Sequence, residues 1–199
     1  GVKYSQKGIA VDEQLRTSAP NIYACGDVAG PYQFSHMAEY QARIAAQNAV
    51  LPVTKRVNYD HYIWCTFTDP ELAHAGLTEE EARARSDDRL RVYTWQYADT
   101  DRGKTDGEEF GVAKFVCDNR YRLLGAHILG PRAGELIHEA QILKTFGIPF
   151  YKLDSVIHVY PTFTDVVKQP AKLCYIDKVR STWYVKLASA LFGRHKPGM

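Results

Sequence analysis

Apolar and polar positions follow two different periods along the 199-residue chain, and each period predicts its own kind of element. A helical period, with alanines three or four residues apart, runs from about Ser35 or His36 to Val50. Ahead of it, the apolar run 22–25 predicts a short buried strand that ends at the Gly26-Asp27 break. The first part of the chain is therefore expected to fold as strand, tight turn, loop and helix.

Beyond about residue 60 the pattern changes to short runs rich in β-branched and aromatic residues, which favour strands. Five strands are predicted, at residues 62–67, 72–76, 90–97, 110–117 and 122–129. The turn Asp118-Asn119-Arg120 separates the last two, so they should form an antiparallel hairpin. The polar stretch 99–109 is expected to be a long exposed connection.

Four helices are predicted among and after these strands. Thr78 and Glu81 form a capping box for a helix that reaches about Ser86. A second helix spans 132–146, and a third starts at Thr162, where Asp165 stands in for the usual Glu of a capping box. Pro170 should interrupt the third helix, and a further helix should reach about Phe192. The fold class is therefore α+β, an antiparallel sheet flanked by helices after a short α/β segment.

Composition narrows the class of protein. Apolar residues make up 45% and aromatic residues 12% of the chain, too much for a disordered protein. No apolar run approaches the roughly 18 residues of a membrane span, and a net charge of +2 does not indicate nucleic-acid binding. The four cysteines lie far apart, without a C-x-x-C pair, so no metal site is expected. Scattered free thiols, and a start that does not resemble a signal peptide, favour the cytoplasm.

The charge is uneven, because the residues from Lys172 onward carry a net charge of +5 and the rest −3. An apolar stripe of Trp183, Leu187 and Leu191 runs through this tail. Packing against the domain or a dimer partner is the preferred interpretation. A helix lying on a membrane surface is the alternative, since basic residues accompany the aromatic ones.

A strand followed by a tight turn and a helix places a ligand between the end of the strand and the start of the helix. Asp27, directly after the strand, can accept hydrogen bonds from the hydroxyls of a sugar or polyol. The helix dipole at Ser35 and His36 would favour negative charge nearby. These residues are consistent with an electron-rich cofactor that carries a polyol, or alternatively with a plain turn at Gly26-Asp27.

Four stretches, in this order, resemble the carboxyl-terminal part of the pyridine-nucleotide–disulfide oxidoreductases, the family of the flavoprotein disulfide reductases. Residues 17–27 match the family's second FAD motif, T-x-x-P-x-I-Y-A-x-G-D, and the helix that starts His36-Met37-Ala38 follows it. Residues 67–79 resemble the start of the family's dimerisation domain. Residues 130–137 and the Pro161-Thr162 segment resemble its end.

The resemblance implies a domain division and a cofactor site. Residues 1–57 would be the end of an FAD-binding domain, 58–170 a dimerisation domain that forms a homodimer, and 171–199 a basic helical tail. Gly26 and Asp27 would contact the FAD ribityl chain. Phe34, Ser35 and His36 would lie near the pyrimidine edge of the flavin, where the helix dipole favours negative charge.

Two departures from the family pattern matter. The redox-active cysteine pair and the G-x-G-x-x-G fingerprints are absent from this sequence. We therefore expect the chain to be part of a longer enzyme, with the amino-terminal FAD and NAD(P)H domains elsewhere, and to be inactive and a poor FAD binder alone.

The second departure is Tyr160, where many members of the family have a catalytic His before Pro-Thr. A phenol with a pKa of about 10 is a poor proton shuttle at neutral pH. Asp165 takes the place of the family's Glu and is one methylene shorter. His158 is retained, as a structural residue in the preferred interpretation and as a displaced base in the other. Tyr at this position is similar to mercuric reductases and the soluble transhydrogenase, although the terminal Cys-Cys pair of mercuric reductases is missing.

Two functions from different classes follow. The first is a portion of an FAD-dependent, NAD(P)H-linked oxidoreductase, mercuric-reductase-like, whose electron acceptor is a disulfide, metal ion, quinone or nucleotide. The second is a non-catalytic dimerisation or interaction module. A transhydrogenase-like or other non-disulfide reductase is a variant of the first.

Overall fold

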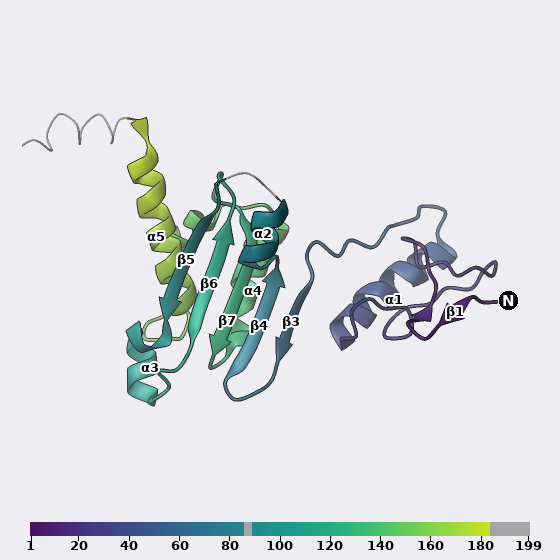
Figure 1. Ribbon diagram of the computed structural model, residues 1–199, viewed down its shortest axis with the longest axis horizontal. Helices are drawn as coiled ribbons and strands as arrows, with labels where there is room; N and C mark the ends of the chain where they lie inside the picture. Colours follow the sequence, from purple (N-terminus) through teal and green to yellow (C-terminus); the bar gives the residue numbers. More distant parts are fainter. Residues whose placement is uncertain (86–88, 184–199) are drawn as a thin grey trace, which may run out of the picture. The chain divides into compact units, whose positions relative to one another are not determined.

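The computed structural model describes residues 1–85 and 89–183 of the chain (Figure 1). The chain divides into two compact units, Gly1–Asp60 and the part from His61 onward. Each unit has its own hydrophobic core and is described by itself. No helix in the described ranges is both long and apolar enough to cross a membrane.

The first unit is built around one long helix, α1 (Ser35–Val50), which confirms the predicted helix. A small hairpin of β1 (Tyr4–Ser5) and β2 (Gly8–Ile9) precedes it. The buried core is small, and it consists of Leu15, Ile44 and Ala45, with partly buried apolar residues around them. Such a core contributes little burial energy, so polar contacts must hold much of this unit together.

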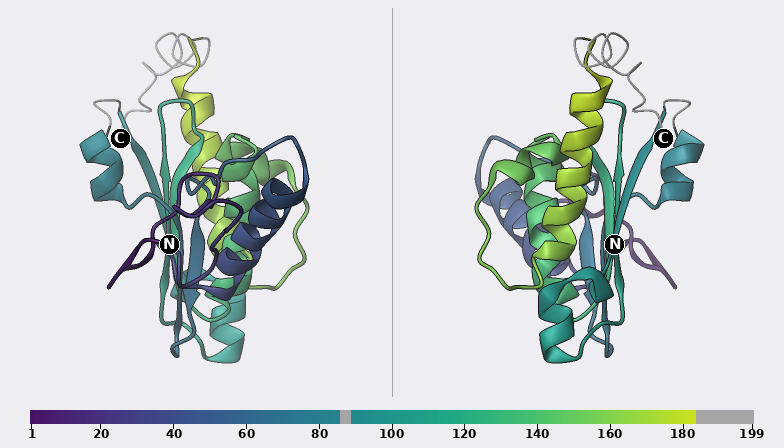
Figure 2. Two further views of the ribbon diagram at one scale, coloured as in Figure 1. Left: turned by 90° about the vertical axis from the view of Figure 1, so that its right-hand side faces the viewer. Right: turned by 90° about the vertical axis from the view of Figure 1, so that its left-hand side faces the viewer.

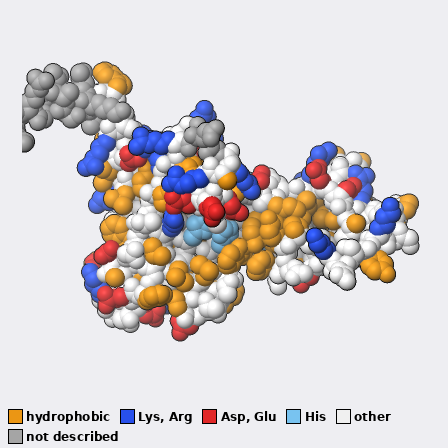
Figure 3. Space-filling model, in the orientation of Figure 1, with side chains coloured by type: hydrophobic (Ala, Val, Ile, Leu, Met, Phe, Trp, Pro, Cys, Tyr) orange, Lys and Arg blue, Asp and Glu red, His pale blue; other side chains and the backbone are white. Residues whose placement is uncertain are grey.

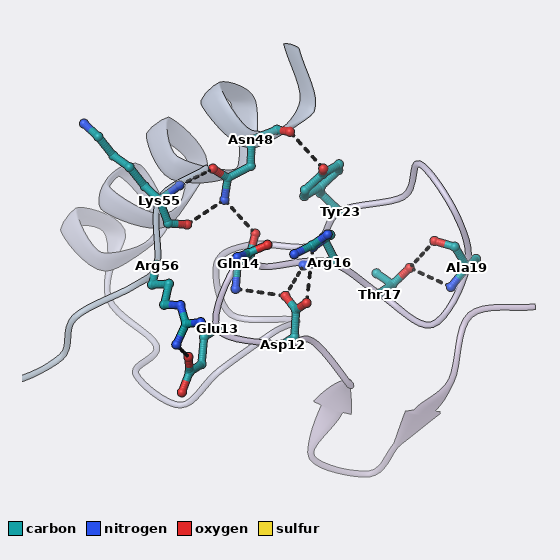
Figure 4. A network of polar contacts seen from close by, with 10 residues as sticks. All are labelled: Asp12, Glu13, Gln14, Arg16, Thr17, Ala19, Tyr23, Asn48, Lys55 and Arg56. Atoms are coloured by element: carbon teal, nitrogen blue, oxygen red, sulfur yellow. Dashed lines mark hydrogen bonds and ion pairs between the residues drawn. The ribbon is translucent and has the colours of Figure 1, made fainter. Parts of the chain in front are cut away.

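Buried amide side chains of α1 supply those contacts (Figure 4). The Asn48 side chain donates to the carbonyls of Gln14 and Lys55 at 3.0 and 2.8 Å and accepts from the Lys55 amide at 2.7 Å. The Tyr23 hydroxyl donates to the Asn48 carbonyl at 2.9 Å. One helical residue therefore fixes two loops that the sequence pattern leaves undefined.

The predicted strand over residues 22–25 is wrong. Only Tyr23 forms an antiparallel bridge, with Arg16, and Ile22 is half exposed. Leu15 and Asn21 have φ angles of 64° and 63°, in the left-handed region, so neither side of the pair stays extended for long. The apolar run is thus a bridge within a loop.

The second unit contains a five-stranded antiparallel sheet with the strand order β3-β4-β7-β6-β5. Its strands are β3 (Ile63–Thr66), β4 (Glu71–Gly76), β5 (Arg91–Gln96), β6 (Val112–Cys117) and β7 (Leu123–Gly130). All five were predicted, with ends that differ by one or two residues. The predicted β6–β7 hairpin is confirmed, and Asp118 stabilises its turn by accepting hydrogen bonds from the amides of Arg120 and Arg122, both at 2.8 Å.

Helices cover both faces of this sheet unequally. Figure 2 shows α4 and α5 on one face and the short α2 on the other. The helices are α2 (Glu79–Arg85), α3 (Asp101–Asp106), α4 (Ala133–Thr145) and α5 (Asp165–Ser181), with the 3-10 turns η1 (Tyr97–Asp99) and η2 (Phe150–Ser155). The predicted α+β class, an antiparallel sheet flanked by helices, is confirmed.

The main core lies between the sheet and α4, α5 and η2. Small side chains on the inner face of the sheet and on α4 allow the helix to approach closely. Larger side chains fill the remaining space. The small residues are Ala73, Ala75, Ala113, Ala126, Ala133 and Ala140, and the largest buried ones are Tyr97, Phe115, Phe150, Ile128 and Ile137.

The stretch 99–109, predicted to be an exposed connection, contains η1 and α3 instead. Thr100 is the N-cap of α3, and its buried hydroxyl accepts from the Gly103 amide at 3.0 Å. Gly107, with a φ of 72°, ends the helix. The prediction failed because these cap residues enclose a helix of only one and a half turns, too short to show an apolar period.

The two predicted capping boxes have different outcomes. The Thr78–Glu81 capping box is confirmed, with hydrogen bonds in both directions. The capping box predicted at Thr162 is wrong, because α5 begins after Thr164 and the Thr162 hydroxyl donates to the Val159 carbonyl.

Pro170 does not interrupt α5, which continues to Ser181 with the proline ring fully buried. Packing of that ring compensates for the helical hydrogen bond that proline cannot donate. The predicted helix as far as Phe192, including Leu187 and Leu191, lies outside the described residues.

Candidate functional site

The loop that carries Gly26 and Asp27 is fixed by one buried side chain of α1. Gln41, which is fully buried, accepts a hydrogen bond from the Gly26 amide at 2.6 Å. Its amide nitrogen donates to the Gly30 carbonyl and to the Tyr59 hydroxyl, both at 2.9 Å. Gly26 has a φ of 76°, and an added Cβ would lie 3.2 Å from the Ala38 side chain, so a residue without a side chain is required there. The loop is therefore held close against the helix.

Asp27 and the start of α1 present complementary charge to solvent within this unit. The Asp27 carboxylate is exposed, and Ser35 and His36 are exposed in the first turn of the helix. Phe34 is the N-cap of α1, and its own side chain makes no capping hydrogen bond. The rings of Phe34 and His36 stack with centroids 5.5 Å apart. All five predicted cofactor-binding residues therefore lie in the first unit. Two of them are in the turn Gly26-Asp27, and the other three are at the start of α1.

Tyr160 lies in the second unit, and its partner is an aspartate that the sequence analysis did not select. The Tyr160 hydroxyl donates to the Asp101 carboxylate at 2.5 Å. This hydrogen bond, together with the negative charge of Asp101, raises the pKa of Tyr160 above its ordinary value. The side chain is 69% exposed. The phenol therefore keeps its proton at neutral pH and acts as a hydrogen-bond donor.

Asp165, at the start of α5, forms no hydrogen bond with Tyr160 among the described residues. Its negative charge adds only a minor contribution to the raised pKa of Tyr160. The side chain of Asp165 is one methylene shorter than that of Glu, which put a contact with Tyr160 in doubt. In the structure, Asp101 makes the contact with Tyr160 instead.

His158 is oriented by two acceptors. Its Nε2 lies 3.1 Å from the Glu139 carboxylate of α4, and its Nδ1 lies 2.9 Å from the Val156 carbonyl. Because a neutral imidazole carries one N–H, both contacts are satisfied only when both ring nitrogens are protonated. The side chain is 6% exposed. His158 thus ties the segment 156–160 to α4.

An apolar groove of about 480 Å³ lies beside this contact, between α4 and the segment 156–160. Several apolar side chains at or near its rim are strongly exposed. They are Ile142, Ile157 and Val159, and Ile157 is 99% exposed. An exposed apolar surface of this kind is typical of a protein–protein contact.

Sequence reasoning therefore missed three positioning residues: Gln41, Asp101 and Glu139. Gln41 stands in the motif that follows the FAD-like stretch, but nothing in its spacing indicates that it is buried. Asp101 and Glu139 act on residues 59 and 19 positions away, so only the tertiary fold brings them into contact. No cluster of three or more His, Cys, Asp or Glu side chains within residues 1–85 and 89–183 is arranged to hold a metal ion.

The fold and these sites define a class of protein. The signature of the "Pyridine nucleotide-disulphide oxidoreductase, dimerisation domain" matches residues 62–171, and that of "Pyridine nucleotide-disulphide oxidoreductase" matches residues 1–49. The chain therefore belongs to the pyridine nucleotide-disulphide oxidoreductase family, as its motifs predict.

Relatives within the family come from several branches. The chain is 37% identical to a dihydrolipoyl dehydrogenase of Thermus scotoductus, over 86% of this chain and 37% of that protein. It is 31% identical to a mercuric reductase of Bacillus cereus, over 84% of this chain and 27% of that protein. The solved structure of the HOCl-induced flavoprotein disulfide reductase RclA from Escherichia coli superimposes with a TM-score of 0.78 and 28% identity, over 86% of this chain and 40% of that one. The chain thus spans about a third of the length of the curated relatives it matches.

Proposed function

We propose that this chain forms the carboxyl-terminal portion of an FAD-dependent, NAD(P)H-linked oxidoreductase. In this proposal residues 1–57 complete an FAD-binding domain, 58–170 form the dimerisation domain, and 171–199 are a basic tail. The proposal is supported above all by the loop of Gly26 and Asp27, which Gln41 holds against the start of α1. Family membership supports the choice of cofactors.

The residues of the first unit are chemically suited to FAD. The exposed Asp27 carboxylate can accept hydrogen bonds from the ribityl hydroxyls of FAD. Phe34, Ser35 and His36 would lie near the flavin, where the first-turn amides of α1 favour negative charge. When bound, FAD would supply the transfer of electrons from NAD(P)H. The part played by this chain is to bind and orient it.

The second unit supplies, in this proposal, the contact with a second copy. The exposed apolar groove between α4 and the segment 156–160 is the surface suited to it. Ile157→Glu places a charge at the most exposed position of that surface and should convert a dimer to a monomer in sedimentation velocity. Val53→Glu, at a 69% exposed position of the first unit, is the matched control and should leave the dimer intact. A monomeric wild-type chain at micromolar concentration would count against the homodimer.

Tyr160, Asp165 and His158 are proposed to form the active-site motif that faces the electron acceptor. With its only hydrogen donated to Asp101, Tyr160 would accept a hydrogen bond from another group rather than shuttle a proton. This property favours a mercuric-reductase-like or other acceptor that needs no thiol acid–base histidine. The acceptor itself remains one of a disulfide, metal ion, quinone or nucleotide.

The decisive test uses the gene that encodes the chain. The coding sequence upstream of Gly1 should contain two G-x-G-x-x-G fingerprints. In the protein expressed with that part, Asp27→Ala should weaken FAD binding about tenfold, which corresponds to ~1.4 kcal/mol. Glu39→Ala removes an exposed carboxylate of α1 and is the matched control. Absence of both fingerprints would support the second candidate instead, a non-catalytic dimerisation module, which the exposed apolar groove alone would explain.

A further inference from the structure

Two histidines form a close pair on the face of the sheet opposite α4 and α5. His74 of β4 and His127 of β7 are cross-strand partners in the antiparallel register, and their Nδ1 atoms lie 3.0 Å apart. Trp64 of β3 stacks on His74, with ring centroids 5.0 Å apart and an interplanar angle of 15°. Figure 3 shows a pale blue histidine patch on this face, next to acidic side chains. The pair plays no part in the site proposed above.

The backbone fixes the orientation of one ring. His127 Nε2 lies 3.1 Å from the Leu77 carbonyl, which can only accept, so this nitrogen carries the hydrogen. In the neutral ring, His127 Nδ1 then presents its lone pair to His74. Histidines that bind metals usually donate their other N–H to a carbonyl or carboxylate in this way, because that contact sets the tautomer and the ring orientation.

The surroundings keep both rings in the neutral form that binds metals. Burial lowers the pKa of His74 and of His127 below the ordinary value. Lys144 acts in the same direction on His74, and Lys114 and the partner ring do so on His127. A cation bound at the Nδ1 atoms would require the hydrogen of His74 on Nε2 rather than on Nδ1.

The charges around the pair also matter for a bound cation. Glu81, in α2, acts electrostatically on both rings and supplies negative charge at this place. Lys114 pairs with Glu79 at 2.6 Å, which offsets its positive charge. The field at the pair is thus less positive than the two lysines alone would make it.

The distance between the two Nδ1 atoms suits a shared metal ion. Two imidazole nitrogens at about 2.0–2.1 Å from one ion lie about 2.9 Å apart at a right angle and about 3.3 Å apart at the tetrahedral angle. The observed 3.0 Å lies in this interval. Small rotations of the rings would therefore suffice, with no movement of the strands.

We propose that His74 and His127 form a two-histidine site for a late first-row divalent ion, Cu²⁺ or Zn²⁺, through their Nδ1 atoms. Imidazole nitrogen suits both ions, and Cu²⁺ should bind more tightly than Zn²⁺. Since the described residues hold no cluster of three or more protein ligands, water or one added oxygen ligand completes the coordination. Such a site binds reversibly and leaves positions open to a small ligand. The competing explanation is an N–H···N hydrogen bond between the two rings, without any role in binding.

The test is a titration of the 199-residue chain with Cu²⁺ at pH 7, followed by electron paramagnetic resonance and by tryptophan fluorescence. The first equivalent should give a spectrum with two nitrogen ligands and should quench the fluorescence of Trp64, which lies next to the site. Zn²⁺ in excess should displace the signal. His74→Asn and His127→Asn should each weaken binding of the first equivalent at least tenfold, and circular dichroism should establish that each variant is folded.

His138→Asn is the matched control, because His138 is an exposed single histidine on α4. It should leave the first equivalent unchanged, and Trp64→Phe should abolish quenching while retaining the paramagnetic spectrum. If the first equivalent shows no two-nitrogen signature, or if both pair variants bind it as the wild type does, the proposal is wrong. If one pair variant does not fold, the other still decides, since loss of either ligand breaks the chelate.

Discussion

Asp177 joins the second half of α5 to the sheet, and replacing it with Asn tests how the helix is held there. Its carboxylate accepts from Arg91 Nη1 at 2.5 Å and from the Tyr93 hydroxyl at 2.9 Å. The Arg91 side chain is only 19% exposed, and its Nε is buried without a partner among the described residues. The guanidinium also stacks over the ring of Tyr121, 4.3 Å from the centroid. Asn at position 177 preserves the size and one acceptor oxygen but removes the charge.

The expected loss of stability follows from these contacts. A hydrogen bond to a charged group contributes about 1.5–3 kcal/mol, and a neutral one about 1 kcal/mol. The Arg91 guanidinium would keep its charge in a mostly buried position without the counterion, which adds to the loss. Because the Asp177 side chain is 41% exposed, water screens part of the effect. We therefore expect Asp177→Asn to lower the free energy of unfolding of the second unit by about 2 kcal/mol.

Tryptophan fluorescence in a urea titration measures this unit alone. The three tryptophans, Trp64, Trp95 and Trp183, all follow residue 60, so the first unit contributes no signal. The transition midpoint should fall while its slope stays unchanged, since the surface exposed on unfolding is the same.

Arg83→Gln is the control, because it breaks an ion pair with Glu79 within one turn of α2, at a side chain that is 61% exposed. It should cost no more than about 0.5 kcal/mol. If Asp177→Asn costs no more than the control, the idea that this cluster anchors α5 is refuted.

Three further variants test other parts of the second unit. Thr100→Val removes the buried hydroxyl that caps α3 and should cost about 1–2 kcal/mol in the same urea titration. Gly125→Ala would place a Cβ 1.8 Å from the Leu77 carbonyl, so it should cost more than about 3 kcal/mol or prevent folding, as judged by circular dichroism. Asp101→Asn should lower the pKa of Tyr160, because the carboxylate charge that raises this pKa is removed. An ultraviolet titration would measure the shift, with Tyr160→Phe used to identify the signal of Tyr160.

Strands and long helices could be predicted because their period is repeated several times within one element. β7 alternates buried and partly buried residues over positions 126–130, and α4 repeats its apolar face over three turns. Each repeat adds evidence for the same element, and tertiary packing agrees with the local pattern.

Elements that depend on one or two residues were harder to predict. α3 has six residues and is defined by the cap at Thr100 and the turn at Gly107. α5 continues through Pro170, although a break was expected there. Burial of the proline ring outweighs the helical hydrogen bond that is lost, and no local sequence pattern shows that burial. A tertiary contact thus decides the structure at Pro170, whereas α3 depends on two local cap residues that produce no repeated pattern.

The candidate site shows the same limit. Gly26 and Asp27 could be selected because a motif carries them, and the motif lies within one loop. Gln41, which holds that loop, is fifteen positions from Gly26, and Asp101 is 59 positions from Tyr160. Neither distance corresponds to a local period. Motifs therefore select candidate ligand-binding residues, and the fold is needed to find the residues that position them.

The partner of Tyr160 restricts the chemistry that the segment 156–160 can perform. Asp101 accepts the phenol hydrogen and makes the phenolate harder to form, while His158 is turned toward Glu139 and the Val156 carbonyl. A thiol acid–base catalyst must exchange a proton near neutral pH, and the raised pKa of Tyr160 makes this side chain unsuited to that exchange.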